Sequence, residues 1–130
     1  MIDERTLRRA LWFSVFYNLS GAFLFGFPQS FAGRLAGLPS SVPALYAAML
    51  GYFVLLFAGT YLWLALQREI VRPMIAQAAT GKACAFLIVA SCWVSGAVGG
   101  RAVIATTGDL VLALIFAGWL LGGAGAEAAR

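Results

Sequence analysis

Four long apolar runs dominate the pattern of hydrophobic and polar positions along the chain. They cover residues 10–27, 44–66, 74–98 and 102–121. Each run is close in length to the roughly twenty helical residues that cross a hydrocarbon core of about 30 Å. Because lipid offers no hydrogen-bond partner, the backbone N–H and C=O groups of such a run must be paired within their own segment, which favours helices over strands. The pattern therefore predicts four transmembrane α-helices.

The spacers between these runs are short and contain residues that end helices. Pro28 follows the first run, Pro39 and Pro43 precede the second, and Gly99 and Gly100 follow the third. Proline interrupts the helical hydrogen-bond ladder and glycine is a poor helix former. No spacer is long enough to form a domain of its own. We expect an all-α fold, an integral membrane four-helix bundle that forms one domain over residues 1–130.

The composition also indicates a lipid environment. Hydrophobic residues make up 62% of the chain and charged residues 11%, whereas a soluble domain keeps roughly 25% of its residues charged. The basic residues give a net charge of +4 but are scattered, without the basic stripe and stacking aromatic residues that bind nucleic acid. We therefore expect membrane lipids as partners and no nucleic acid.

The basic residues also predict an orientation, because cytoplasmic loops of membrane proteins carry an excess of Lys and Arg. Arg5, Arg8 and Arg9 precede the first run, and Arg68 and Arg72 separate the second from the third. The two other spacers hold one arginine each. This distribution predicts a multi-pass protein of the bacterial inner (plasma) membrane with both termini in the cytoplasm.

The first run has an alternative interpretation as a cleaved signal peptide. Arg8 and Arg9 before an apolar segment resemble the basic and hydrophobic regions of such a peptide. The run is longer than that hydrophobic region usually is, and it contains Asn18. We therefore expect a retained helix, with cleavage as the alternative.

Three polar residues lie well inside the predicted helices: Asn18, Lys82 and Asp109. An ionisable side chain near the centre of a bilayer costs at least roughly 2.5–3.5 kcal/mol and tends to have a function or a partner. Lys82 and Asp109 belong to adjacent antiparallel helices within reach of each other, which allows an ion pair. If the third helix instead begins near Thr80, Lys82 extends to the cytoplasmic headgroups and Asp109 lacks this partner. The sequence leaves both arrangements open.

Small residues share helix faces with these polar positions, on the first and fourth runs. Transmembrane helices approach closely along such faces, so the polar residues can serve simply to hold the bundle together. The functional alternative is a polar pocket between the first, third and fourth helices that takes up a lipid-like or small apolar ligand. Its candidate lining residues are Asn18, Lys82, Asp109, Tyr17, Tyr52 and Tyr61.

Several kinds of chemistry are disfavoured by what the sequence lacks. It contains no His, the commonest general base and a common metal ligand. Cys84 and Cys92 are eight residues apart on one predicted helix, too far for a disulfide, and we expect both to be small core residues. Proton-coupled multidrug exporters with four helices need an acidic residue in the first helix, and the first run has none. We expect no cofactor, no metal site and no catalytic residue.

The chain resembles small bacterial four-helix membrane proteins close to the DoxX-like group. The resemblance is carried by scattered residues in all four runs and their spacers: Asn18, Pro28, Gly37, Leu38, Pro39, Gly59, Tyr61, Gly81, Lys82, Gly108, Asp109, Leu110, Phe116, Trp119 and Leu120. It implies a four-helix bundle. DoxX itself is associated with membrane oxidoreductase assemblies, but this sequence lacks redox residues that would support a catalytic part in one.

Three functions remain as hypotheses. The first is a non-enzymatic membrane protein whose inner polar face binds a small apolar or lipid-like molecule or steadies a partner. The second is an accessory subunit of a larger membrane complex, in contact with a membrane-protein partner or with further copies of itself. The third and least favoured is an enzyme for a lipid-soluble substrate, with Asp109 as acid or base and Lys82 as its charge partner.

Overall fold

The computed structural model describes residues 2–128, and the side chains of residues 2–122. Within this part of the chain the structure has five helices and no strand: α1 (Glu4–Gly26), α2 (Phe31–Leu35), α3 (Ala44–Leu66), α4 (Arg72–Val94) and α5 (Gly100–Ala128). The prediction of an all-α fold is confirmed.

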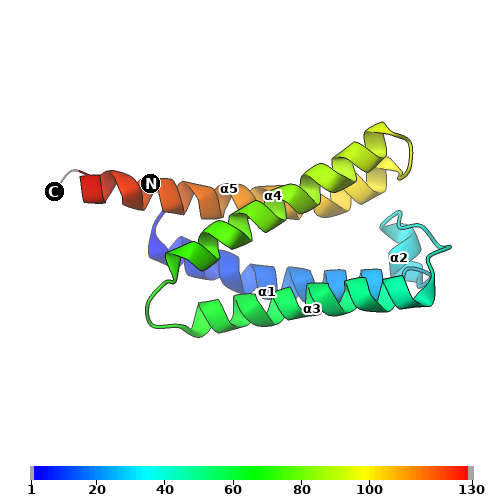
Figure 1. Cartoon of the computed structure of the whole chain (residues 1–130), viewed down its shortest axis with the longest axis horizontal. Coiled ribbons are helices and arrows are strands. Elements are labelled where there is room, and N and C mark those ends of the chain that lie inside the picture. The colour runs from blue at the N-terminus through cyan, green and yellow to red at the C-terminus, as the bar shows by residue number, and fades with distance from the viewer. Residues whose placement is uncertain (1, 129–130) are drawn as a thin grey trace.

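The long helices are arranged as two antiparallel pairs (Figure 1). Helix α1 packs along α3, α4 packs along α5, and α5 joins the pairs through its contact with α1. Helix α1 begins at the end of the molecule where α5 ends (Figure 1). Helices α3 and α4 and the segment Gly100–Gly122 of α5 are long and apolar enough to cross a membrane, by length and composition. Helix α1 is equally long, with 23 residues, but its first turns are charged.

Helix α1 begins at Glu4, six residues before the first apolar run. Asp3 caps it, because its side chain accepts a hydrogen bond from the backbone N–H of Thr6 at 2.9 Å. The hydroxyl of Thr6 and then its backbone N–H lower the pKa of Asp3, since hydrogen bonds from both favour the ionised carboxylate. The apolar run therefore marked the hydrophobic part of the helix, whereas a capping residue in the polar flank sets its start.

Helix α4 ends at Val94, before the predicted end at residue 98. Gly96 adopts a positive φ of 78°, a conformation that glycine takes without the strain of a Cβ atom. The N–H of Gly96 then donates to the carbonyl of Trp93 at 2.9 Å, and the N–H of Ala97 donates to that of Cys92 at 2.8 Å. This pair of bonds is a Schellman motif, which satisfies the last carbonyls of the helix. The helix ends four residues earlier than the predicted end at residue 98.

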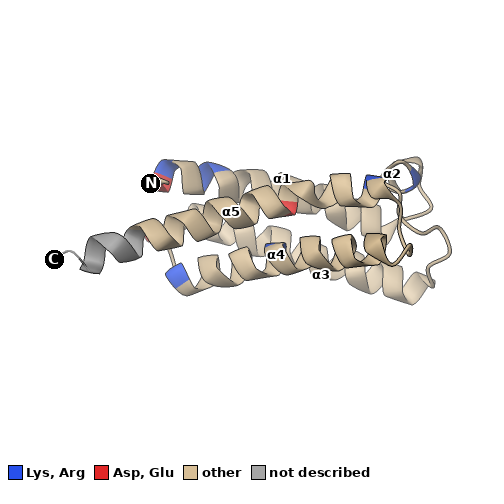
Figure 2. Cartoon of the chain, turned by 90° about the horizontal axis from the view of Figure 1, so that it is seen from above, with Lys and Arg blue, Asp and Glu red and all other residues tan. Residues whose placement is uncertain are grey.

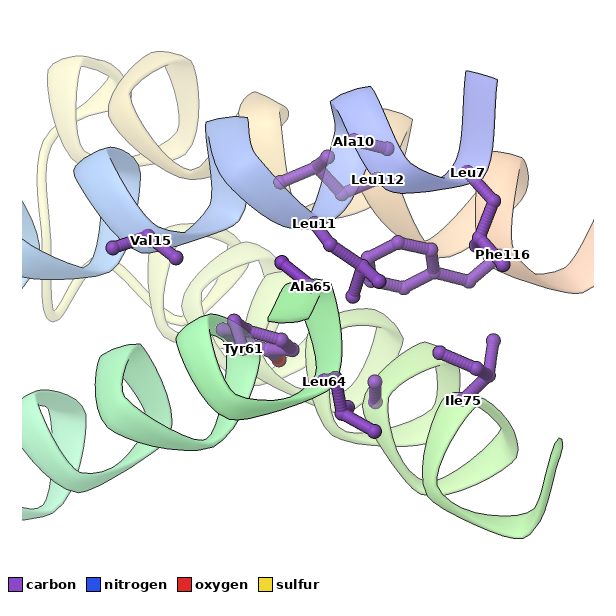
Figure 3. Close-up of a cluster of buried hydrophobic side chains, with 11 residues drawn as sticks. Leu7, Ala10, Leu11, Val15, Tyr61, Leu64, Ala65, Ile75, Leu112 and Phe116 are labelled. Carbon is purple, nitrogen blue, oxygen red and sulfur yellow. The ribbon is translucent and has the colours of Figure 1, made fainter. Parts of the chain in front are cut away.

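The hydrophobic core occupies the half of the molecule that contains the start of α1, the end of α3 and the start of α4 (Figure 3). Leu7 and Leu11 of α1 meet Leu64 of α3, Ile75 of α4 and Phe116 of α5 there, all at most 1% exposed. The buried residues of α4 all lie in its first half, and Lys82 is the last of them. Lys82 therefore marks the depth at which the core on α4 ends.

Arg8 fastens the start of α1 to the end of α3. Its guanidinium donates to the carbonyls of Ala65, Gln67 and Arg68 at 3.2, 2.8 and 2.9 Å. These carbonyls belong to the last turn of α3 and the residues after it, where no further helical N–H is present to pair with them. From the sequence, Arg8 indicated only topology or a signal peptide, because a contact with a segment 57 residues away has no local signature.

We expect Arg8→Ala to lower the free energy of unfolding by about 1–2 kcal/mol, since charge-assisted hydrogen bonds to partly buried carbonyls are lost. Thermal unfolding in detergent measures the loss. Arg9→Ala is the matched control, because Arg9 is exposed on the same helix. Equal losses in both variants would show that Arg8 acts only through its net charge.

Candidate functional site

Lys82 lies at the centre of a buried polar cluster where α1, α4 and α5 meet. Its side chain is only 3% exposed. The ammonium nitrogen Nζ donates to Oδ1 of Asp109 on α5 at 2.7 Å and to Oδ1 of Asn18 on α1 at 3.1 Å. A buried charge is tolerated when it is paired and hydrogen-bonded, and here both conditions are met.

Two aromatic rings complete the surroundings of this ammonium group. Nζ lies 5.2 Å from the ring centroid of Tyr17 on α1 and 5.0 Å from that of Tyr61 on α3. Both distances fall within the roughly 6 Å at which a cation is attracted to the face of an aromatic ring. Lys82 thus interacts with side chains from α1, α3 and α5, and we call Lys82, Asp109, Asn18, Tyr17 and Tyr61 the Lys82 cluster.

Tyr17 is fixed between α1 and α5. Its hydroxyl donates to the carbonyl of Ala105 at 2.5 Å, and its ring lies directly on Gly108. A Cβ atom at position 108 would lie 2.6 Å from that ring, closer than carbon atoms approach in proteins. The absence of a side chain at Gly108 therefore allows Tyr17 to lie beside Asp109.

Asp109 is the more accessible member of the ion pair. Its side chain is 15% exposed, against 3% for Lys82.

Ser14, one turn before Asn18 on the same face of α1, is fully buried, and its hydroxyl has no hydrogen-bond partner among the described residues. The polar face of α1 therefore extends beyond the groups that Lys82 binds.

The structure brings together five of the six predicted site residues. Asn18, Lys82, Asp109, Tyr17 and Tyr61 form the Lys82 cluster, and Lys82 binds Asp109 rather than extending to the end of its helix.

Tyr52, the sixth, lies elsewhere. It is 57% exposed, next to the ring of Phe53. Nine residues separate it from Tyr61, and at about 100° per residue this places the two side chains on opposite faces of α3.

A shallow groove lies beside this cluster, between α3 and α4. It has a volume of about 90 Å³. Apolar and polar side chains of both helices line it: Phe57, Thr60, Tyr61, Leu64, Met74, Gln77 and Ala78. We expected a pocket between α1, α4 and α5 instead, but there the polar side chains bind one another. Tyr61 belongs both to the groove and to the Lys82 cluster.

The cysteines are not core residues as we expected, since Cys84 is exposed and Cys92 is half-buried, both with free thiols. They lie on the part of α4 after Lys82, where no residue through Val94 is buried. Among the described residues, no group of three or more His, Cys, Asp or Glu side chains is placed to hold a metal ion.

Comparison with protein-family models, curated proteins and solved structures finds no match to this chain. The resemblance to the DoxX-like group stays a prediction, and the Lys82 cluster with its adjacent groove is the feature from which a function can be inferred.

Proposed function

We propose that α1, α3, α4 and α5 form a four-helix bundle in a bacterial inner membrane, with both ends of the chain in the cytoplasm. Three of these helices have the length and composition of membrane spans, and α1 lies along α3 over the same depth (Figure 1). Basic residues are concentrated at the end of the molecule where α1 begins and α4 starts (Figure 2), which the preference of cytoplasmic loops for Lys and Arg favours as the inner end.

Fusions to alkaline phosphatase, which is active only outside the cytoplasm, test this topology. We expect an active enzyme after Gly37, in the segment between α2 and α3, and an inactive enzyme after Glu69, between α3 and α4. The reverse pattern would invert the orientation, and activity at both sites would mean that α3 does not cross the membrane.

Within this bundle, we propose that the protein is a non-enzymatic binding protein for a small amphiphilic or lipid-like molecule. The ligand lies with its apolar part in the groove between α3 and α4 and with its polar end toward the Lys82 cluster. The observation that carries this proposal is the position of Tyr61, whose side chain lines the groove and whose ring faces Nζ of Lys82 at 5.0 Å. One residue thus connects an apolar surface to a buried charge.

The choice of residues in the cluster supports binding over simple helix association. A buried ion pair is weak evidence for stability, because well-packed apolar residues often stabilise as well or better. Ionisable side chains inside a membrane usually belong to functional sites. The carboxylate of Asp109 is 15% exposed, so the charged end of the cluster is not wholly closed by protein.

The size of the groove limits how much of the ligand it encloses. One water molecule occupies about 30 Å³ in the liquid, so a volume of about 90 Å³ accommodates the end of a hydrocarbon chain or a small branched group. The rest of the ligand must lie outside, along the exposed side chains of α3 and α4. This favours a molecule that enters sideways from the lipid.

Native mass spectrometry of the purified protein tests this function. We expect a retained small molecule in the wild-type protein and its loss in Thr60→Phe, because the new ring fills the groove. Thr107→Phe is the matched control: each hydroxyl bonds the carbonyl four residues earlier, at 3.0 Å for Thr60 and 3.1 Å for Thr107, and Thr107 is exposed on α5. Absence of any retained species from the wild-type protein, or equal retention by both variants, would contradict the proposal.

A second candidate function is that of an accessory subunit in a larger membrane complex. Exposed positions on α4 include Ala76, Thr80, Gly81 and Cys84, and a Cβ atom at Gly81 would meet nothing within 4 Å. Small and polar residues on a lipid-facing surface are typical of contacts between transmembrane helices. Stoichiometric co-purification of another membrane protein, lost on Gly81→Leu, would favour this function over ligand binding.

A further inference from the structure

A second groove lies at the opposite end of the molecule from the hydrophobic core, between α2 and α5. Its volume is about 330 Å³, and it is a shallow hollow that is open over most of its extent. The walls are apolar except for one residue, and they are formed by Ala32, Leu35, Ala36, Ile104, Ala105 and Arg101.

Both ends of the short helix α2 have defined caps. Ser30 caps it by accepting the N–H of Gly33 at 3.1 Å. Gly37 ends it with a φ of 76° and lies against α5, because a Cβ atom at Gly37 would be 3.1 Å from Cβ of Arg101. The residue after α2 therefore lies close to the start of α5 at Arg101, on one side of the groove.

In the part of the chain whose side chains the structure describes, no carboxylate pairs with the positive charge at this end. Asp and Glu are absent from residues 5–68 and 70–108, and Asp109 is bound to Lys82. In the described part of the chain, the guanidinium groups of Arg34 and Arg101 form no hydrogen bond or ion pair with another residue, unlike those of Arg8 and Arg72. The α2–α5 groove thus combines an apolar surface with the unneutralised guanidinium group of Arg101.

We propose that the α2–α5 groove binds an anionic phospholipid. A guanidinium group binds phosphate oxygens with two parallel hydrogen bonds, which suits a headgroup phosphate at Arg101. From Arg101 to Ala105 the helix rises about 6 Å, so an acyl chain that starts at this headgroup lies along Ile104 and Ala105 toward the membrane interior. The same order of charge and apolar surface is found in a phospholipid. This site rests on the membrane location of the protein but not on the α3–α4 groove or its ligand.

Native mass spectrometry from nanodiscs with equal amounts of phosphatidylglycerol and phosphatidylcholine of the same acyl chains tests the site. We expect the wild-type protein to retain phosphatidylglycerol preferentially and Arg101→Gln to lower this preference about tenfold, as the loss of a charge-assisted hydrogen-bond pair predicts. Arg9→Gln, with the same change of charge at an exposed residue of α1, should keep the preference. Leu35→Glu, at a position 60% exposed, should abolish it by placing a carboxylate in the groove.

Three results would overturn the assignment. One is equal retention of the two phospholipids by the wild-type protein. Another is an equal loss of preference in Arg101→Gln and Arg9→Gln, which would indicate attraction by net charge alone. The third is displacement of phosphatidylglycerol by an equal concentration of palmitic acid, which would identify a fatty-acid site. Thr60→Phe should leave the preference unchanged, so failure of this site and failure of the α3–α4 groove are distinguishable.

Discussion

Replacing either member of the Lys82–Asp109 pair should destabilise the protein far more than replacing both. Asp109→Asn leaves the ammonium of Lys82 buried with only neutral amide oxygens as hydrogen-bond acceptors and no counter-charge, and Lys82→Met leaves the carboxylate of Asp109 without its cation. Loss of one partner from a buried pair costs roughly 3–5 kcal/mol, whereas removal of both is often close to neutral. Thermal unfolding in detergent of the two single variants and the double variant measures this difference.

Glu4→Gln supplies the control for this double-mutant cycle. Glu4 forms an ion pair with Arg8 at 2.8 Å, but its side chain is 57% exposed, and an exposed pair contributes at most about 1 kcal/mol. A double variant that loses the sum of the two single losses would show that Lys82 and Asp109 do not interact. A coupling energy between Lys82 and Asp109 as small as that between Glu4 and Arg8 would contradict the conclusion that the Lys82 cluster needs both charges.

The positions of the long helices were predictable because an apolar run of about twenty residues is a strong and simple helix signal. Helix α3 has the predicted bounds, 44–66. The ends of the other helices were less well predicted, since caps set them: Asp3 lies in the polar flank of α1, and Gly96 lies within the apolar third run. The short α2 was not predicted, because a five-residue helix gives no periodic pattern.

The Lys82 cluster was predictable in part for a related reason. Charged residues are rare in apolar runs, so Lys82 and Asp109 stand out without knowledge of the fold. Aromatic residues are common in such runs, and composition does not distinguish Tyr61, which faces Lys82, from Tyr52, which faces outward. The rotation of α3 about its axis decides between them, and that rotation depends on its packing against α1. The α3–α4 groove was missed because it depends on the angle between helices that are distant along most of their length (Figure 1).

Gly108→Ala should destabilise the protein by about 3 kcal/mol, at the upper end of the range for overpacking. The new Cβ atom would lie 2.6 Å from the ring of Tyr17. That ring has little freedom to move, because its hydroxyl is bound to the carbonyl of Ala105 and its face is 5.2 Å from Nζ of Lys82. Thermal unfolding in detergent measures the loss, and native mass spectrometry shows whether the small molecule expected in the α3–α4 groove is lost with it.

Gly59→Ala is the matched control, because a Cβ atom on this glycine of α3 meets nothing within 4 Å. A glycine-to-alanine change in an uncrowded helix stabilises it by up to about 1 kcal/mol, so Gly59→Ala should be neutral or stabilising. In a Tyr17→Ala background the crowding ring is absent, and Gly108→Ala should then resemble Gly59→Ala. If Gly108→Ala destabilises the protein equally with and without Tyr17, the ring of Tyr17 is not the reason that position 108 needs glycine. In that case the contact between α1 and α5 is also not what places Tyr17 beside Asp109.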